Sequence, residues 1–117
     1  MPPQPISEKL DPSLFVRFLG NYPAIRVYDF ILENDILDYS KKYIYQNANV
    51  SWNTLETFWK QLEETNIVKH TRKVGKSEMY KLNVQNPIVQ QLLQLNKRLL
   101  KLSFEKIGRP AKGILIA

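Results

Sequence analysis

The residues best suited to chemistry in this chain are cations gathered on one short segment. Five of them stand against a single acidic residue between positions 69 and 81: Lys69, Arg72, Lys73, Lys76 and Lys81. Such side chains bind phosphate oxygens through charge and hydrogen bonds, so a polyanion is the expected ligand. The alternative is a solvated basic surface, and charge alone does not separate the two interpretations.

A second set of polar residues lies just before the cations, on a predicted helix over residues 51–64. Ser51 can cap this helix by accepting a hydrogen bond from a first-turn backbone N–H group. Four apolar residues then recur at steps of three and four, which is the pattern of an amphipathic helix: Leu55, Phe58, Trp59 and Leu62. The remaining positions provide the outer, solvent-facing candidates: Trp52, Asn53, Thr54, Glu56, Thr57 and Lys60.

The cations belong to a predicted β-hairpin that follows this helix. Asn66 tolerates the left-handed conformation at a helix end. Residues 67–71 and 77–82 have the composition of two short strands, and residues 72–76 form a loop that contains Gly75.

The segments before residue 51 are predicted to supply the core. Residues 1–10 form a flexible arm, and Asp11 and Pro12 start a helix that ends at Gly20. A core helix starts at Pro23. Ser40 caps a short helix to about Asn47, with Tyr43 and Ile44 buried, and Asn49 occupies a tight turn that requires positive φ. Lys41 and Lys42 start that short helix and are further candidates for phosphate contacts.

The last predicted helix, residues 86–107, has more apolar surface than one small core needs. Five residues alternate steps of four and three, the spacing of a coiled-coil seam: Ile88, Leu92, Leu95, Leu99 and Leu102. A second stripe of Val89, Leu93, Leu100, Phe104 and Ile107 runs beside it. We therefore expect a homodimer through this helix, the alternative being burial of both stripes in one domain. The tail, residues 108–117, is short and apolar, with no assigned role.

Composition places these elements in one globular domain, residues 11–85, extended by the dimerisation helix. The 117 residues are 44% hydrophobic and carry a net charge of +6. The charge is uneven: −3 for residues 1–38, +4 for residues 39–81 and +5 for residues 82–117. No apolar run approaches a membrane span, and the start lacks the features of a signal peptide. Without cysteine there are no disulfides, and we expect a cytoplasmic protein.

Signatures of catalysis are missing from the sequence. The single histidine, His70, has no carboxylate within several residues along the chain, which gives a triad or a metal site little support. There is no Gly-rich phosphate loop. We expect neither an enzyme, a metal nor a cofactor, and nothing in the sequence indicates a small-molecule effector.

With these residues in view, positions 18–102 resemble the winged-helix transcription regulators of the broad MarR/ArsR-like group in archaea and bacteria. The resemblance rests on short sequence segments that occur in the same order as in that group: residues 22–26, 44–51, 54–55, 62–64, 67–68, 71–77 and 80–83. It implies a mainly α fold with a small β-hairpin, a winged helix-turn-helix with a long C-terminal helix. It also implies a dimer on double-stranded DNA, with helix 51–64 in the major groove and the hairpin on phosphates or in the minor groove.

The implied contacts follow from side-chain chemistry. Asn53 could pair with adenine, Glu56 could accept from cytosine N4, and threonines could touch a thymine methyl or a phosphate. Trp52 could stack on a sugar, although a lone tryptophan more often folds onto its own domain, which is what we expect here.

Three departures from the family pattern keep other functions open. Tyr45 stands where a small residue is usual, Asn49 where glycine is usual, and the start of helix 51–64 lacks the usual basic residues. The alternatives are a winged helix that binds protein and a protein that packages DNA without base contacts.

Overall fold

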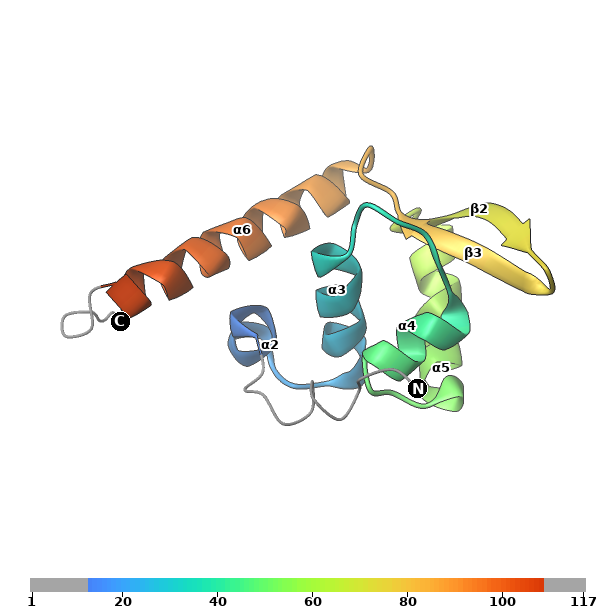
Figure 1. Ribbon diagram of the computed structural model, residues 1–117, viewed down its shortest axis with the longest axis horizontal. Coiled ribbons are helices and arrows are strands. Elements are labelled where there is room, and N and C mark those ends of the chain that lie inside the picture. The colour runs from blue at the N-terminus through green and yellow to red at the C-terminus, as the bar shows by residue number, and fades with distance from the viewer. Residues whose placement is uncertain (1–12, 109–117) are drawn as a thin grey trace.

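The computed structural model describes residues 13–108, which form five helices and a three-stranded sheet within that range (Figure 1). The helices are α2 (Leu14–Leu19), α3 (Pro23–Glu33), α4 (Lys41–Asn47), α5 (Trp52–Glu64) and α6 (Pro87–Gly108). The strands are β1 (Tyr39–Ser40), β2 (Val68–Val74) and β3 (Ser77–Leu82). The chain is therefore mainly α with a small antiparallel sheet and a long last helix, and the predicted winged-helix fold is confirmed.

Helices α3, α4 and α5 surround the core because each turns its apolar stripe inward. The largest fully buried side chains include Trp59, Leu55, Ile44 and Val27, all at most 2% exposed. Serines fix where two helices begin, as predicted: the Ser40 hydroxyl accepts from the Tyr43 N–H and the Ser51 hydroxyl from the Thr54 N–H. The prediction that Tyr43 is buried is wrong. Its ring is 46% exposed, because it stacks on Tyr39 at the surface, with the ring centroids 5.0 Å apart.

The turn between α4 and α5 has the predicted conformation, and it also receives hydrogen bonds from α3 that the sequence did not predict. Asn49 has φ 59°, the left-handed geometry that asparagine tolerates. The Arg26 guanidinium of α3 donates to the carbonyl oxygens of Ala48 and Asn49, at 3.1 Å each. Because Arg26 of the core helix α3 holds this turn, the turn keeps its conformation without a glycine at position 49.

Helix α2 begins later than the sequence predicted. Its N-cap is Ser13, whose hydroxyl accepts from the Val16 N–H at 3.2 Å, whereas Asp11 and Pro12 lie outside the described residues. Phe15 and Val16 are buried, but Phe18 is 65% exposed, so only part of the apolar surface of this helix packs into the core.

The sheet has the order β1-β3-β2 and extends further than the predicted hairpin. The predicted loop was too long: β2 continues to Val74, which pairs with Ser77 and leaves Gly75 and Lys76 as a two-residue turn. Gly75 has φ 62° at the first central position, as type II′ turns require. Strand β1 was not predicted, because two residues give no periodic pattern. Thr71 is the extra residue of a bulge in β2, between the His70–Tyr80 and Arg72–Met79 pairs.

Helix α6 follows the β2–β3 hairpin and runs back over α3 and α2 before it projects past them (Figure 1). Val89 is fully buried, and the side-chain amide of Asn96 donates to Glu33 of α3 at 2.9 Å. Leu92, Leu95 and Leu99 are partly buried against the same core. Three of the five residues of the predicted dimer seam therefore contact the chain's own domain, whereas Ile88 and Leu102 remain 56% and 39% exposed.

Candidate nucleic-acid interface

The outward face of α5 is a row of polar side chains that no other element covers. Asn53, Thr57 and Lys60 are all exposed. Within the described chain the Asn53 amide has no hydrogen-bonding partner, and the Lys60 ammonium lies 3.9 Å from Glu64, one helical turn away. These groups stay available because the opposite face of the helix carries Leu55, Trp59 and Leu62 into the core.

The hydroxyl groups on this helix are largely occupied by the helix itself. Ser51 Oγ accepts from the Thr54 backbone N–H at 3.1 Å and donates to Thr54 Oγ1 at 2.9 Å. Thr57 Oγ1 donates to the Thr54 carbonyl at 2.6 Å. Ser51 and Thr54 thus form the start of α5 and hold its first turn in shape. What Thr57 presents outward is chiefly its methyl group.

A four-residue cluster joins α4 to the start of α5. The Lys41 ammonium contacts Glu56 Oε2 at 2.8 Å and lies 5.2 Å from the centre of the Trp52 ring. The Tyr45 ring meets Trp52 edge-on, with centroids 5.9 Å apart. Tyr45 is therefore accommodated where a small residue was expected. Lys41 and Glu56 neutralise each other, so neither is the free group that the sequence suggested.

The expectation that Trp52 belongs to the core is wrong. Its side chain is 47% exposed, whereas Trp59 on the same helix is 1% exposed. Trp52 is the first residue of α5, where the core beneath the helix has ended, so only Tyr45 and Lys41 support one side of the ring.

The β2–β3 hairpin, called the wing from here on, is held at its base by a salt bridge. The Arg72 guanidinium donates to both carboxylate oxygens of Asp38, with Nε–Oδ2 at 2.9 Å and Nη2–Oδ1 at 3.0 Å. The Thr71 hydroxyl donates to the same carboxylate at 2.6 Å. These hydrogen bonds, from Arg72 first and Thr71 second, lower the pKa of Asp38 to about 2. The bulge at Thr71 turns both side chains toward Asp38, on the segment before β1.

The remaining cations of the wing divide into paired and free groups. Glu78 accepts from His70 at 2.6 Å and lies 3.9 Å from the Lys73 ammonium. The carboxylate beside His70 escaped the sequence prediction, because it comes from the neighbouring strand. Lys69 and Lys76 are exposed and have no acidic partner among residues 13–108, and the same holds for Lys42 on α4.

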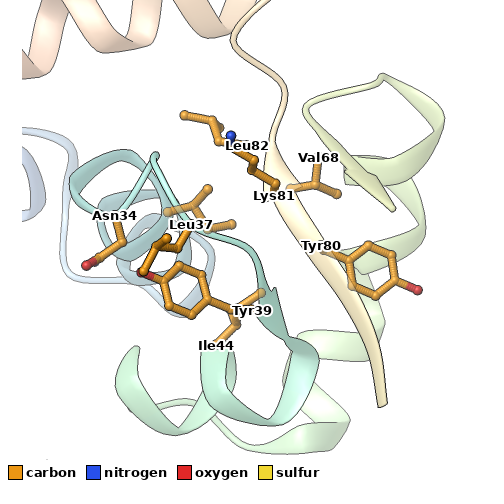
Figure 2. Close-up of a pocket in the computed structure, with 9 residues that line it drawn as sticks. Asn34, Leu37, Tyr39, Ile44, Val68, Tyr80, Lys81 and Leu82 are labelled. Carbon is orange, nitrogen blue, oxygen red and sulfur yellow. The ribbon is translucent and has the colours of Figure 1, made fainter. Parts of the chain in front are cut away.

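One small cavity lies between α3, α4 and the sheet, and Figure 2 shows its lining. It measures about 10 Å³, room for about one water molecule. Apolar side chains such as Ile31, Ile44 and Leu82 line most of it, so it is a packing defect of the core and not a ligand site. Across residues 13–108, no three acidic or histidine side chains lie close enough together to hold a metal ion. None of the described helices is both long and apolar enough to cross a membrane.

Comparison with known proteins gives little beyond the fold. No protein-family model matches the sequence, and no curated protein is significantly similar to it. Among solved structures, the chain is similar to the crystal structure of Sso10a-2, a DNA-binding protein from Sulfolobus solfataricus. The similarity has a TM-score of 0.44 and 11% sequence identity, over 76% of this chain and 96% of the other. No function is transferred at this level, and the proposal below rests on the chain's own residues.

Proposed function

We propose that this chain is a winged-helix protein that binds double-stranded DNA, with α5 in the major groove and the wing on the backbone or in the minor groove. The observation that carries this proposal is the pairing of two surfaces in one fold. An uncovered polar helix face stands next to a hairpin whose Lys69 and Lys76 have no acidic partner in the described chain. A helix of this kind fits the major groove, and free lysines beside it fit phosphates.

The candidate residues have different tasks in this proposal. Asn53 would pair with adenine, and the Thr57 methyl would meet a thymine methyl. Lys42, Lys60, Lys69 and Lys76 supply phosphate contacts. Lys73 is partly neutralised by Glu78, and Arg72 reaches a phosphate only after it leaves Asp38. The remaining candidates bind each other, Ser51 with Thr54 and Lys41 with Glu56. In this proposal they shape the start of α5 and have no direct contact with DNA.

We further propose a homodimer that regulates transcription in the cytoplasm, in the manner of the MarR/ArsR-like proteins. Support for the dimer comes from α6, where Ile88 and Leu102, the first and last residues of the predicted seam, remain exposed. Two copies joined through α6 would present two α5 helices, and the DNA half-sites would then lie about one helical turn apart.

Selection of bound duplexes from a random pool tests binding and specificity together. We expect enrichment of a sequence with two related half-sites. On that sequence, Asn53→Ala should relax the preference at one or two base pairs by about 1–3 kcal/mol without changing the salt dependence. Lys76→Gln should instead weaken binding to all sequences equally. Binding without any enrichment would favour nonspecific DNA packaging.

A protein partner is the second candidate, and one surface favours it. Ile36 and Leu37 are 76% and 61% exposed beside the aromatic cluster of Phe30, Tyr39 and Tyr43. If the chain binds no duplex even at low salt, this apolar surface becomes the better guide to function.

A further inference from the structure

Trp52 is the largest apolar side chain on the surface that the proposed function turns toward DNA. Its exposure of 47% is unusual for a residue with so much apolar area. It is also the first residue of α5, and the N-terminal residues of a recognition helix are those that reach base edges.

The ring is held in place by groups from the neighbouring helix. Lys41 and Tyr45 lie one turn apart on α4 and face Trp52 and Glu56, one turn apart on α5. Tyr45 meets the indole edge-on at an interplanar angle of 66°, and the Lys41 ammonium lies 5.2 Å from the ring centre. Since the 2.8 Å Lys41–Glu56 contact anchors that ammonium, these contacts hold the ring while 47% of the residue stays exposed. A ring held in this way loses little conformational freedom when it meets a ligand.

The charges around the ring are balanced, which determines the kind of group it can contact. Lys41, the cation over the Trp52 ring, is paired with Glu56 and is not free to bind a phosphate. What remains is an apolar surface at the start of a helix with polar neighbours. In the major groove, the apolar group that a base pair displays is the C5-methyl of a pyrimidine.

We propose, on the basis of the proposed function, that Trp52 recognises the C5-methyl group of a pyrimidine in the major groove. Thymine and 5-methylcytosine share this group. Trp52 then acts as a specificity-determining residue, and Lys41, Tyr45 and Glu56 position it. The contact adds sequence preference at a helix start that has none of the usual basic residues.

Duplexes that differ only in this methyl group test the proposal. The first pair is alternating d(AT) and alternating d(AU), and the second is alternating d(GC) with and without methylation of cytosine C5. We expect the unmodified protein to favour the methylated member of a pair about fourfold, the effect of burying one methyl-sized group. The pair that shows the preference identifies the base.

Variants separate the ring from indirect effects of the methyl group on DNA shape. Trp52→Ala alone should lower the preference, and Trp52→Ala with Thr57→Ser, which also removes the Thr57 methyl, should reduce it to about one. Asn53→Ala should retain the full preference. The exposed position of Trp52 leaves the fold intact on substitution, and circular dichroism checks this. In Trp59→Phe the sole remaining tryptophan is Trp52, and acrylamide quenching of its fluorescence should decrease when the methylated duplex is added.

Two outcomes overturn the inference in distinguishable ways. If the protein binds all four duplexes with no preference, or if Trp52→Ala keeps the preference, the methyl contact is refuted and the proposed DNA binding stands. If no duplex is bound even at low salt, the methyl contact and the proposed DNA binding are both refuted.

Discussion

At the residue scale, two tryptophans seven positions apart on one helix have opposite environments. Trp59 is 1% exposed and meets the Tyr80 ring edge-on, with centroids 5.1 Å apart, whereas Trp52 is 47% exposed. Trp52 was expected to fold onto its own domain, as a lone tryptophan more often does, and the sequence does not show that the core ends before the first turn of α5. Trp59 Nε1 has no hydrogen-bond partner among residues 13–108, so packing and the Lys41 ammonium, 5.5 Å from the ring centre, hold that ring in the core.

Replacing Trp59 should therefore lower the stability of the fold strongly, and replacing Trp52 should not. We expect Trp59→Ala to lower the free energy of unfolding by about 3–5 kcal/mol, the range for truncating a buried aromatic ring. Trp52→Ala serves as the control, with an expected loss of under about 1 kcal/mol. Urea unfolding followed by circular dichroism measures both. Equal losses would mean that the burial of the two rings is assigned wrongly.

Single residues with local roles were the most predictable part of the chain. Ser40 and Ser51 cap helices, and Asn49 and Asn66 both have φ 59°, as their types and positions predicted. These assignments depend on a few neighbouring residues. The pairing of Lys41 with Glu56 was not predictable in the same way, because it depends on how α4 crosses α5.

At the element scale, the wing is the part whose position depends most on charge. Its base is tied to the segment before β1 by the Asp38–Arg72 salt bridge and the Thr71 hydroxyl. Helix α2 begins later than predicted, whereas the bounds of the other described helices followed from cap residues and from the periodicity of the sequence. Strand β1, the bulge at Thr71 and the continuation of β2 to Val74 did not, because pairing with β3 decides them.

Acid should release the base of the wing. The pKa of Asp38 is lowered from 3.8 to about 2 by its hydrogen bonds to Arg72 and then Thr71. A lowered folded-state pKa means that the contribution to stability is complete above about pH 4 and is lost as the pH falls toward 2. An NMR titration of the Asp38 carboxyl carbon should give a midpoint near the lowered value, together with shifts of the Thr71 and Arg72 amides. A midpoint at the ordinary value would rule out the salt bridge in solution.

Releasing Arg72 should also strengthen DNA binding by the wing. In Asp38→Asn the guanidinium loses its ionic partner and becomes available to a phosphate. We expect the slope of log affinity against log salt to steepen by about 0.9 per protomer. Asp35→Asn is the matched control, because it removes the same charge from a residue without an ion pair in the described chain. Identical slopes for the two variants would show that Arg72 stays away from DNA.

At the scale of the whole molecule, the shape is elongated because α6 extends past the domain it covers (Figure 1). The extents are 51 × 33 × 23 Å, and the radius of gyration is 15.4 Å, against about 13 Å for a compact chain of this size. The second apolar stripe is where the sequence prediction was least complete: Val89 is buried in the chain's own core, whereas Phe104 is 69% exposed. Ile107 lies beyond the described side chains.

The proposed dimer predicts which α6 substitutions matter. We expect light scattering at micromolar concentration to give twice the monomer mass. Ile88→Glu with Leu102→Glu should give a folded monomer, because both side chains are exposed in the single chain and would be buried between two. Leu100→Glu, at 43% exposure outside the seam, is the control and should remain a dimer. A monomer for the unmodified chain would remove the two-half-site arrangement.

The measurement that most directly tests DNA binding by this face is the salt dependence of affinity in two double variants. Lys69→Gln with Lys76→Gln removes two exposed cations of the wing that have no acidic partner in the described chain. Lys97→Gln with Lys101→Gln removes the same charge from the exposed side of α6. We predict that the slope of log affinity against log salt shrinks by about 1.8 per protomer in the wing variant, about 0.9 for each lost phosphate contact. The α6 variant should keep the slope of the unmodified protein. An unchanged slope in the wing variant, or an equal loss in both, would contradict the proposal that the wing contacts DNA.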